Sequence, residues 1–309
     1  MKIYKGIDKF DKISDAVVTT GTFDGVHIGH QSIISRLNEV AKKVKGESVI
    51  LTFYPHPRMV LQEDCDLKLI TTIEEKIELL RKTGLDHLII HPFTKDFSRT
   101  TSLEFVRNIL VEKIGTQRLV IGYDHHFGRN REGSFEHLKE FSSLYGFEVE
   151  EISAKDIDDV NVSSTKIRKA LLDGDVKTAT TYLGHNFQLT GVVVHGNKVG
   201  RELGYPTANI DIQNEYKLIP AEGIYAVKVR LNNQKYRGML NIGRRPTINS
   251  GNGQLSIEVN IFDFNQDIYG QAIQLELIQR IRDEKKFNSK EELIAEMKKD
   301  KVKCERILS

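Results

Sequence analysis

Short apolar runs alternate with amphipathic stretches along the first half of the chain. Ala16–Thr20 and Ser48–Phe53 are apolar runs of strand length, and apolar residues recur at helical spacing from Ile28 to Val44. The same alternation continues with helices predicted at Ile73–Lys82, Leu103–Lys113 and Phe135–Tyr145, and strands at His87–Ile90, Arg118–Ile121 and Glu148–Ile152. This order predicts an α/β domain with a doubly wound parallel sheet and helices on both faces.

The pattern changes after Ser163. Two short helices are predicted at Thr165–Leu172 and Val176–Leu183, and a strand-rich region follows. Its predicted strands are Gln188–His195, Gly223–Leu231, Lys235–Ile242, Gln254–Phe262 and Ala272–Ile281. Turn signals between them favour an antiparallel barrel or sandwich, closed by a terminal helix at Ser289–Met297 with Ser289 as N-cap. We therefore expect two domains, residues 1–183 and residues 184–309.

Length and composition agree with two domains and argue against several classes of protein. At 309 residues the chain exceeds the usual size of one core, and its net charge of +2 comes from mixed acidic and basic residues. A dedicated nucleic-acid binder more often concentrates its basic residues, so we expect no nucleic-acid partner. Cys65 and Cys304 alone make neither a disulfide framework nor a zinc site. No apolar run suits a signal peptide or a membrane span, so we expect a cytoplasmic protein with no membrane partner.

The loop after the first predicted strand has the composition of a phosphate site. Parallel sheets bind ligands beyond the C-terminal ends of their strands, and here that end is followed by the segment GTFDGVHIGH, residues 21–30. Its glycines allow close approach of a ligand, and the next helix offers free N–H groups to phosphate. His27 and His30 lie on one side of the first turn, where two imidazoles can stabilise charge on an α-phosphate under attack. A structural helix cap with incidental histidines, or a zinc site, remain alternatives.

Three further segments of the first half carry candidate residues. In VSSTKIR, Ser163 or Ser164 can cap a helix. The first turns of this helix hold Thr165, Lys166 and Arg168, which together form a cationic segment suited to the β- and γ-phosphates of ATP. An ordinary capped helix explains the same residues. The loop FYPHP, with His56 and Pro57, and the residue Asp124 follow other predicted strands, and each is also explained by a simple turn.

Together these segments resemble the prokaryotic FAD synthetases of the nucleotidyltransferase superfamily. The match is to their G-x-F-D-G-x-H-x-G-H, T-F-x-P-H-P, G-x-D-x-x-F-G-x-x-R-x-G and S-S-T-x-I-R motifs, in that order. The resemblance implies adenylylation of FMN to FAD, with His27, His30 and Arg168 catalytic and with His56 and Pro57 binding flavin. It also implies that the nucleotide is bound by Gly21, Thr22, Phe23, Asp24, Gly29, Asp124, Ser163, Ser164 and Thr165.

The second half holds a glycine-rich segment, GNKVGRELGYPTAN, that contains no Walker loop. Gly196 and Gly200 suit a loop that wraps phosphate. Thr207 and Asn209 are two apart, so on a strand they share a face, and with nucleotide phosphates they suit Mg²⁺. A glycine- and proline-rich hairpin with buried Thr and Asn is the alternative interpretation.

This segment resembles the G-x-x-x-G-R-x-L-G-x-P-T-A-N signature of riboflavin kinases, and PAEGIYA, NIGRRPT and IEVN continue the likeness. The resemblance implies that Gly196, Gly200 and Arg201 bind nucleotide and that Thr207 and Asn209 bind the metal. It makes Glu258 the general base for the riboflavin hydroxyl and places Arg282 at a flap over flavin. Many members have His two residues after the Glu, where this chain has Asn260. We expect that difference to tune the site.

The resemblance covers essentially the whole chain and implies an enzyme with two activities. The C-terminal domain would phosphorylate riboflavin, and the N-terminal domain would convert the FMN to FAD. Mg²⁺ would accompany ATP, while FMN and FAD would be substrate and product, not prosthetic groups. The partners would be riboflavin, FMN, FAD and ATP; the oligomeric state does not follow from the sequence. A monofunctional FAD synthetase, a transferase for another small phosphate ester and a flavin-binding regulatory protein are the alternatives.

Overall fold

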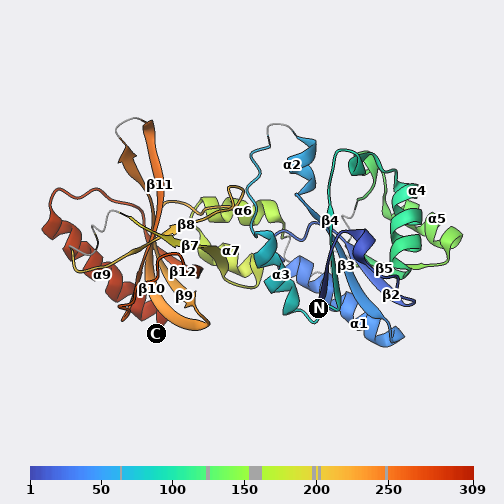
Figure 1. Cartoon of the computed structure of the whole chain (residues 1–309), viewed down its shortest axis with the longest axis horizontal. Coiled ribbons are helices and arrows are strands. Elements are labelled where there is room, and N and C mark those ends of the chain that lie inside the picture. Colours follow the sequence, from blue (N-terminus) through green and yellow to red (C-terminus); the bar gives the residue numbers. More distant parts are fainter. Residues whose placement is uncertain (63–64, 123–125, 153–161, 197–199, 201–202, 248–249) are drawn as a thin grey trace. The chain divides into compact units, whose positions relative to one another are not determined.

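The chain folds into two compact units. The structure, a computed structural model, describes residues 1–62, 65–122, 126–152, 162–196, 200, 203–247 and 250–309. The first unit consists of Met1–Leu67 and Ile73–Ser163. The second unit consists of Lys68–Thr72 and Ser164–Ser309. Among the described residues, no helix combines the length and the apolar content that crossing a membrane requires. Figure 1 labels the elements of each unit.

The first unit is built on a six-stranded sheet whose neighbouring strands are all parallel. The strand order is β1-β4-β3-β2-β5-β6, and Figure 1 labels β2, β3, β4 and β5 of this sheet. The strands are β1 (Lys2–Lys5), β2 (Ala16–Thr20), β3 (Glu47–Tyr54), β4 (His87–Pro92), β5 (Thr116–Gly122) and β6 (Glu148–Ile152). Every residue of β2 is buried, as expected for a central parallel strand covered on both faces. The edge strand β1 was not predicted.

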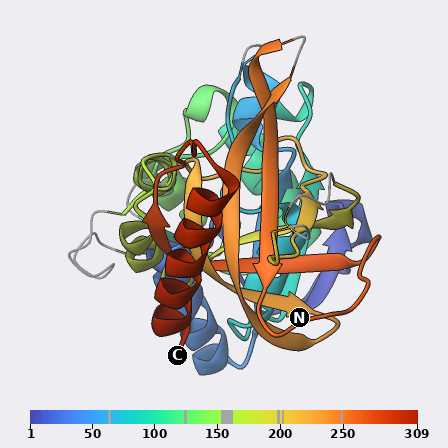
Figure 2. The same cartoon turned by 90° about the vertical axis from the view of Figure 1, so that its left-hand side faces the viewer.

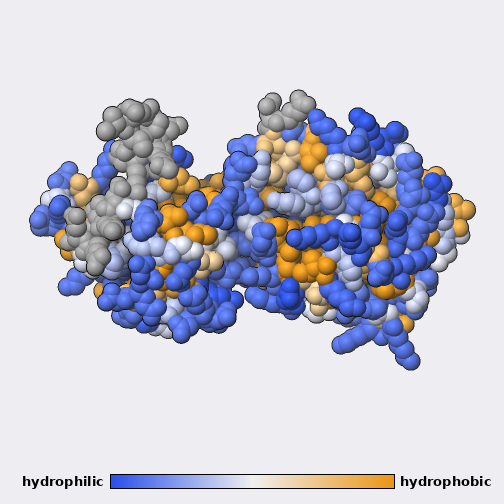
Figure 3. Space-filling view, in the orientation of Figure 1, coloured by the Kyte–Doolittle hydropathy of each residue, from blue (hydrophilic) through white to orange (hydrophobic). Residues whose placement is uncertain are grey.

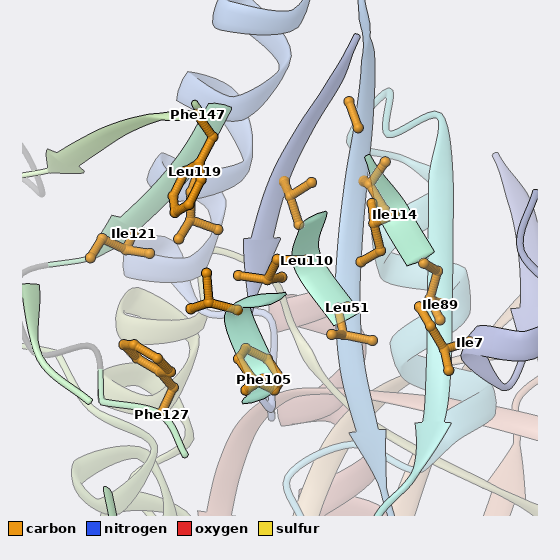
Figure 4. Packing of buried hydrophobic residues seen from close by; sticks show 14 of the residues in the cluster. Ile7, Leu51, Ile89, Phe105, Leu110, Ile114, Leu119, Ile121, Phe127 and Phe147 are labelled. Atoms are coloured by element: carbon orange, nitrogen blue, oxygen red, sulfur yellow. The ribbon is translucent and has the colours of Figure 1, made fainter. Parts of the chain in front are cut away.

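Helices cover both faces of this sheet, which confirms the predicted doubly wound α/β domain. The helices of the unit are η1 (Ile7–Lys9), α1 (Ile28–Val44), α2 (Pro57–Leu61), α3 (Ile73–Arg81), η2 (Phe97–Arg99), α4 (Ser102–Glu104), η3 (Phe105–Ile114), η4 (Arg129–Arg131) and α5 (Phe135–Tyr145). One core cluster joins α1 and α3 to the sheet. A second cluster joins η3 and α5 to the other side, where Leu51, Leu110 and Ile114 pack together (Figure 4).

The segment predicted as the helix Leu103–Lys113 differs in detail. It starts with α4, whose Thr101 and Glu104 form a capping box, and continues as the π-helix η3. At its end Gly115 has φ 81° and its N–H donates to the carbonyl of Leu110, five residues earlier. A left-handed glycine closes the helix here, and the wider i→i+5 turn is a feature that apolar spacing does not reveal.

The second unit contains a closed barrel of antiparallel strand pairs in the order β10-β11-β8-β7-β12-β9. Figure 2 shows the barrel with α9 beside it. The strands are β7 (Phe187–Val194), β8 (Ala208–Asp211), β9 (Gly223–Leu231), β10 (Gln234–Thr247), β11 (Ser250–Ile261) and β12 (Ala272–Arg282). The helices are α6 (Ser164–Leu172), α7 (Val176–Leu183) and α9 (Lys290–Leu308). The predicted barrel with a terminal helix is therefore confirmed.

Helix α9 begins as predicted but is longer. The Ser289 hydroxyl accepts a hydrogen bond of 3.1 Å from the N–H of Glu292. Instead of ending near Met297, the helix runs to Leu308, because Asp300, Cys304 and Leu308 continue a buried stripe at four-residue spacing. On the molecular surface, by contrast, hydrophilic residues cover much of the visible face (Figure 3).

Candidate active sites

The loop between β2 and α1 brings the two predicted histidines into contact. Their rings are stacked, with centroids 3.6 Å apart and planes 18° apart. His27 is the N-cap of α1, and its Nδ1 accepts a hydrogen bond of 3.4 Å from the N–H of His30. A neutral His27 with Nδ1 as acceptor carries its proton on Nε2. The N-terminus of α1 therefore presents ring donors and backbone N–H groups together, as a phosphate site requires.

His30 lies in an environment that disfavours its charged form. Burial lowers the pKa of His30 well below its ordinary value, and a positive charge on His27 or on Lys76 lowers it further. Its Nδ1 is buried and makes no hydrogen bond with any residue that the structure describes. Its ring also packs on Phe23, with centroids 5.1 Å apart. His30 is therefore a neutral imidazole at ordinary pH, able to donate one hydrogen bond to a ligand.

The loop is fixed by the core below it. Phe23 and Val26 have φ of 49° and 43°, values that are uncommon for residues other than glycine. Their side chains are 3% and 1% exposed and join the core cluster under α1. Packing of these side chains compensates for the backbone strain. Asp24 and Gly29 of the same loop are buried as well, and Gly21 sits against the ring of Phe23.

Two residues that were not among the predicted site residues contact this loop, although Thr52 is the first residue of the T-F-x-P-H-P match. Lys76 on α3 donates a hydrogen bond of 2.6 Å from Nζ to the carbonyl of Thr22, and Thr52 at the end of β3 donates one of 3.3 Å to the same oxygen. Lys76 is only 6% exposed. The signal that could have revealed it is a lysine on an apolar stripe, three residues after Ile73 and four before Leu80.

The other candidate residues of the first half lie on other elements. His56 is the N-cap of α2, with Pro57 as the first helical residue, and its Nδ1 accepts a hydrogen bond of 3.2 Å from the N–H of Arg58. Ser164 begins α6, with Ser163 before it and Thr165 after it, and this helix belongs to the second compact unit. In that unit Arg168 donates a hydrogen bond of 2.7 Å to the carbonyl of Lys68. Asp124 lies outside the described residues.

In the barrel, Glu258 is the centre of a hydrogen-bonded group. Thr207 donates a hydrogen bond of 3.0 Å to its Oε2, and Ser256, on the same strand β11, donates one of 2.8 Å to its Oε1. Glu258 also pairs in register with Asn209 on β8. The structure therefore brings together Thr207 and Asn209 of one predicted motif and Glu258 of another, and it adds Ser256, which sequence reasoning missed.

Glycines allow the loop before β8 to lie against this group. A Cβ atom at Gly196 would be 2.1 Å from Nδ2 of Asn209, and one at Gly200 would be 2.4 Å from the carbonyl of Tyr205 and 3.1 Å from Oγ1 of Thr207. Only glycine fits such close approaches. Arg201, predicted to bind nucleotide, lies outside the described residues.

Asn260, which stands where many riboflavin kinases have His, is 6% exposed and donates a hydrogen bond of 2.7 Å to the carbonyl of Pro206. It thereby holds the backbone immediately before Thr207. A cavity of about 390 Å³ opens beside Thr207, with Val259, Phe264 and Tyr269 in its wall. The wall also contains Asn265, Gln266 and Asp267, so apolar and polar groups both face the cavity, whose size is that of a small-molecule site.

Arg282 is held by the terminal helix. Its Nε and Nη2 lie 2.9 and 2.8 Å from Oδ2 of Asp300, a carboxylate that is 1% exposed. Its Nη1 donates to the carbonyl of Asp283 at 2.8 Å. The guanidinium therefore joins the end of β12 to α9.

The barrel offers a small set of oxygen donors to a metal ion. The described residues contain no cluster of three or more His, Cys, Asp or Glu side chains that could hold a metal by themselves. Thr207, Asn209 and Glu258 instead offer one hydroxyl, one amide and one carboxylate beside a loop lined by glycines. Mg²⁺ is commonly held by few protein oxygens together with nucleotide phosphates and water, so these residues fit it.

Comparison with known proteins assigns both halves of the chain. The FAD synthetase family model matches residues 9–166, and the riboflavin kinase family model matches residues 183–308. The chain is 38% identical over 303 residues to a bifunctional riboflavin kinase/FMN adenylyltransferase of Buchnera aphidicola subsp. Schizaphis graminum, covering 97% of this chain and 96% of that protein. It is also 38% identical over 298 residues to a Bacillus subtilis protein of the same name, covering 95% and 93% of the two chains.

A solved structure also matches this chain over nearly its whole length. A Streptococcus pneumoniae crystal structure, described as a macrolide-efflux protein, is 35% identical to this chain, with a TM-score of 0.87. The match covers 97% of both chains.

Proposed function

Because the chain belongs to the family of bifunctional riboflavin kinases/FMN adenylyltransferases, we propose that its two reactions occur at the two groups of residues described above. The enzyme phosphorylates riboflavin with ATP and adenylylates FMN with ATP. We assign FAD formation to the loop with His27 and His30, and FMN formation to the barrel with Glu258. The contact between Thr207 and Glu258 is the observation that best supports an intact kinase site.

For FAD formation, a phosphate oxygen of FMN attacks the α-phosphorus of ATP, the bond to the β-phosphate oxygen breaks, and pyrophosphate leaves. Nothing in this step requires a covalent intermediate with the protein. The stacked rings of His27 and His30 and the N-terminus of α1 suit stabilisation of charge on the α-phosphate. The buried loop holds these donors in place before the substrate arrives, which lowers the cost of reorganisation.

For FMN formation, the 5′-hydroxyl of riboflavin attacks the γ-phosphorus of ATP and ADP leaves. Glu258 accepts the hydroxyl proton as general base. Hydrogen bonds from Thr207 and Ser256 orient its two carboxylate oxygens. We propose that Mg²⁺ with ATP is held by Thr207 and Asn209; when bound, the metal neutralises charge on the phosphates.

The functional domains that we propose are residues 1–183 and 184–309. By contacts, α6 and α7 group with the barrel, whereas the FAD synthetase model ends at residue 166 and the riboflavin kinase model begins at residue 183. The catalytic role expected for Arg168 and the flavin-binding roles expected for His56 and Arg282 stay predictions. We also propose that the protein is cytoplasmic.

A time course of flavins tests the assignment of activity. The purified protein is incubated with riboflavin, ATP and Mg²⁺, and the flavins are separated chromatographically. We expect FMN first and FAD later, and neither product from riboflavin when Mg²⁺ is chelated. FMN alone, or no product with Mg²⁺ present, would contradict the proposal.

A further inference from the structure

Lys76 is a buried cation in the first unit. It lies on the apolar stripe of α3 and is 6% exposed. Taking an ammonium group out of water costs several kcal/mol unless partners compensate. A methionine or leucine at this position would pack on the same stripe without that cost. The lysine is therefore unexpected unless its charge or its hydrogen bond is needed.

The ammonium group of Lys76 contacts the nucleotide loop directly. Its Nζ donates a hydrogen bond of 2.6 Å to the carbonyl of Thr22, the residue immediately before Phe23 and Asp24. Burial lowers the pKa of Lys76, and the carboxylate of Asp24, itself 1% exposed, opposes that shift. The loop thus contains both the acceptor and the negative charge that compensate for burial.

The same positive charge acts on His30. The groups that act on the His30 ring come from three segments: His27 at the N-cap of α1, Phe23 in the loop, and Lys76 on α3. Of these, the two that can carry positive charge both favour the neutral imidazole. Lys76 therefore connects the backbone shape of the loop with the protonation state of one of its histidines.

We infer that Lys76 is a positioning residue for FAD formation, which holds the Thr22 carbonyl and thereby fixes the loop that presents His30. It acts through the loop and through His30, without contact to substrate. The inference rests on the proposed role of His30. It adds a residue on α3 to a site otherwise built from the loop and α1.

The test compares Lys76→Met with Lys76→Arg, using Lys82→Met as control because Lys82 is an exposed lysine directly after α3. Rates of FAD formation from supplied FMN are measured against pH, as kcat/KM for ATP, which reports the pKa values of the free enzyme. FMN formation from riboflavin by the same chain serves as an internal reference. We expect Lys76→Met to lower kcat/KM by about 10- to 100-fold, in line with small displacements of catalytic groups, and to leave FMN formation unchanged.

The pH dependence separates a positioning role from a purely structural one. Loss of the Lys76 charge removes one cause that holds the pKa of His30 down, so this pKa rises. Neutral His30 is then lost at a higher pH as the solution is acidified, and the acid limb of kcat/KM moves to higher pH. Lys76→Arg keeps the charge, so its acid limb should stay where it is in the unsubstituted enzyme.

Three outcomes would overturn the inference: a Lys76→Met enzyme with normal rates, a lower rate with an unmoved acid limb, or an equal loss of both activities. His30→Ala separates this failure from failure of the proposed function. If FAD formation survives His30→Ala, the assigned site is wrong. If His30→Ala stops it while Lys76→Met does not affect it, only the role of Lys76 is wrong.

Discussion

Thr207 donates a hydrogen bond of 3.0 Å to Glu258, which links the start of β8 to β11. In sequence these two residues are 51 positions apart and belong to different motifs. Their contact places the proposed metal ligand directly beside the proposed general base. A phosphate held by the metal would then lie close to the hydroxyl that the base deprotonates.

Ser256 gives the first prediction about this group. Its hydroxyl donates to Oε1 of Glu258 at 2.8 Å, so Ser256→Ala removes a hydrogen bond that orients this carboxylate. We expect FMN formation to fall by about tenfold, the size of effect that one hydrogen bond to a charged group can carry. Steady-state kinetics with riboflavin measures it, and Ser256→Thr, which keeps a hydroxyl, is the control. An unchanged rate in Ser256→Ala would contradict the positioning of Glu258 by Ser256.

Asn209 provides a prediction about the metal. It pairs in register with Glu258, and its amide lies where a Cβ at Gly196 would clash. If Asn209 binds Mg²⁺, then Asn209→Ala should raise the Mg²⁺ concentration for half-maximal FMN formation by about tenfold, equivalent to about 1.4 kcal/mol. The Mg²⁺ dependence of FAD formation from FMN should not change. Equal shifts in both reactions, or no shift in FMN formation, would remove Asn209 from the metal site.

Asp300 and Arg282 give a prediction about stability. The Asp300 carboxylate is 1% exposed, and its loss would leave the partly buried Arg282 guanidinium with only the longer contact of 3.9 Å to Glu296 among the ion pairs of the described residues. We expect Asp300→Ala to lower the free energy of unfolding of the second unit by about 3–5 kcal/mol. Asp283→Ala is the matched control, because Asp283 pairs with Arg280 at 2.8 Å but is 82% exposed. That exposed pair should contribute about 1 kcal/mol or less.

Urea unfolding with a probe for each unit measures these differences. If burial determines the strength of the ion pair, Asp300→Ala should lower the free energy of unfolding clearly more than Asp283→Ala does. Similar small effects of Asp300→Ala and Asp283→Ala would contradict the structural role assigned to the contact between β12 and α9.

Much of the fold follows from local patterns. The apolar run Ala16–Thr20 predicts β2 with its observed bounds, because a fully buried parallel strand is marked by uninterrupted apolar and β-branched residues. The three-residue spacing of His27 and His30 likewise predicts that their rings meet. In both cases the sequence pattern that indicates the feature lies within one short segment.

Features that depend on long-range packing did not follow from the sequence. The segment Lys68–Thr72 belongs to the second unit through Leu69, whose N–H donates to Tyr216 at 2.6 Å and whose carbonyl accepts from Leu218 at 2.8 Å. Lys76 looks like a surface lysine until the fold places it under the loop. Likewise, the hydroxyl of Ser256 gains meaning only from the face of β11 on which Glu258 also lies.

The central claim is that one chain holds two separate active sites, one at His30 and one at Glu258. The direct test follows flavins chromatographically in Glu258→Gln and His30→Ala, each supplied with riboflavin or with FMN, together with ATP and Mg²⁺. We predict that Glu258→Gln makes no FMN from riboflavin yet converts supplied FMN to FAD, while His30→Ala accumulates FMN and forms no FAD. FAD formation that survives His30→Ala, or FMN formation that survives Glu258→Gln, would contradict the assignment.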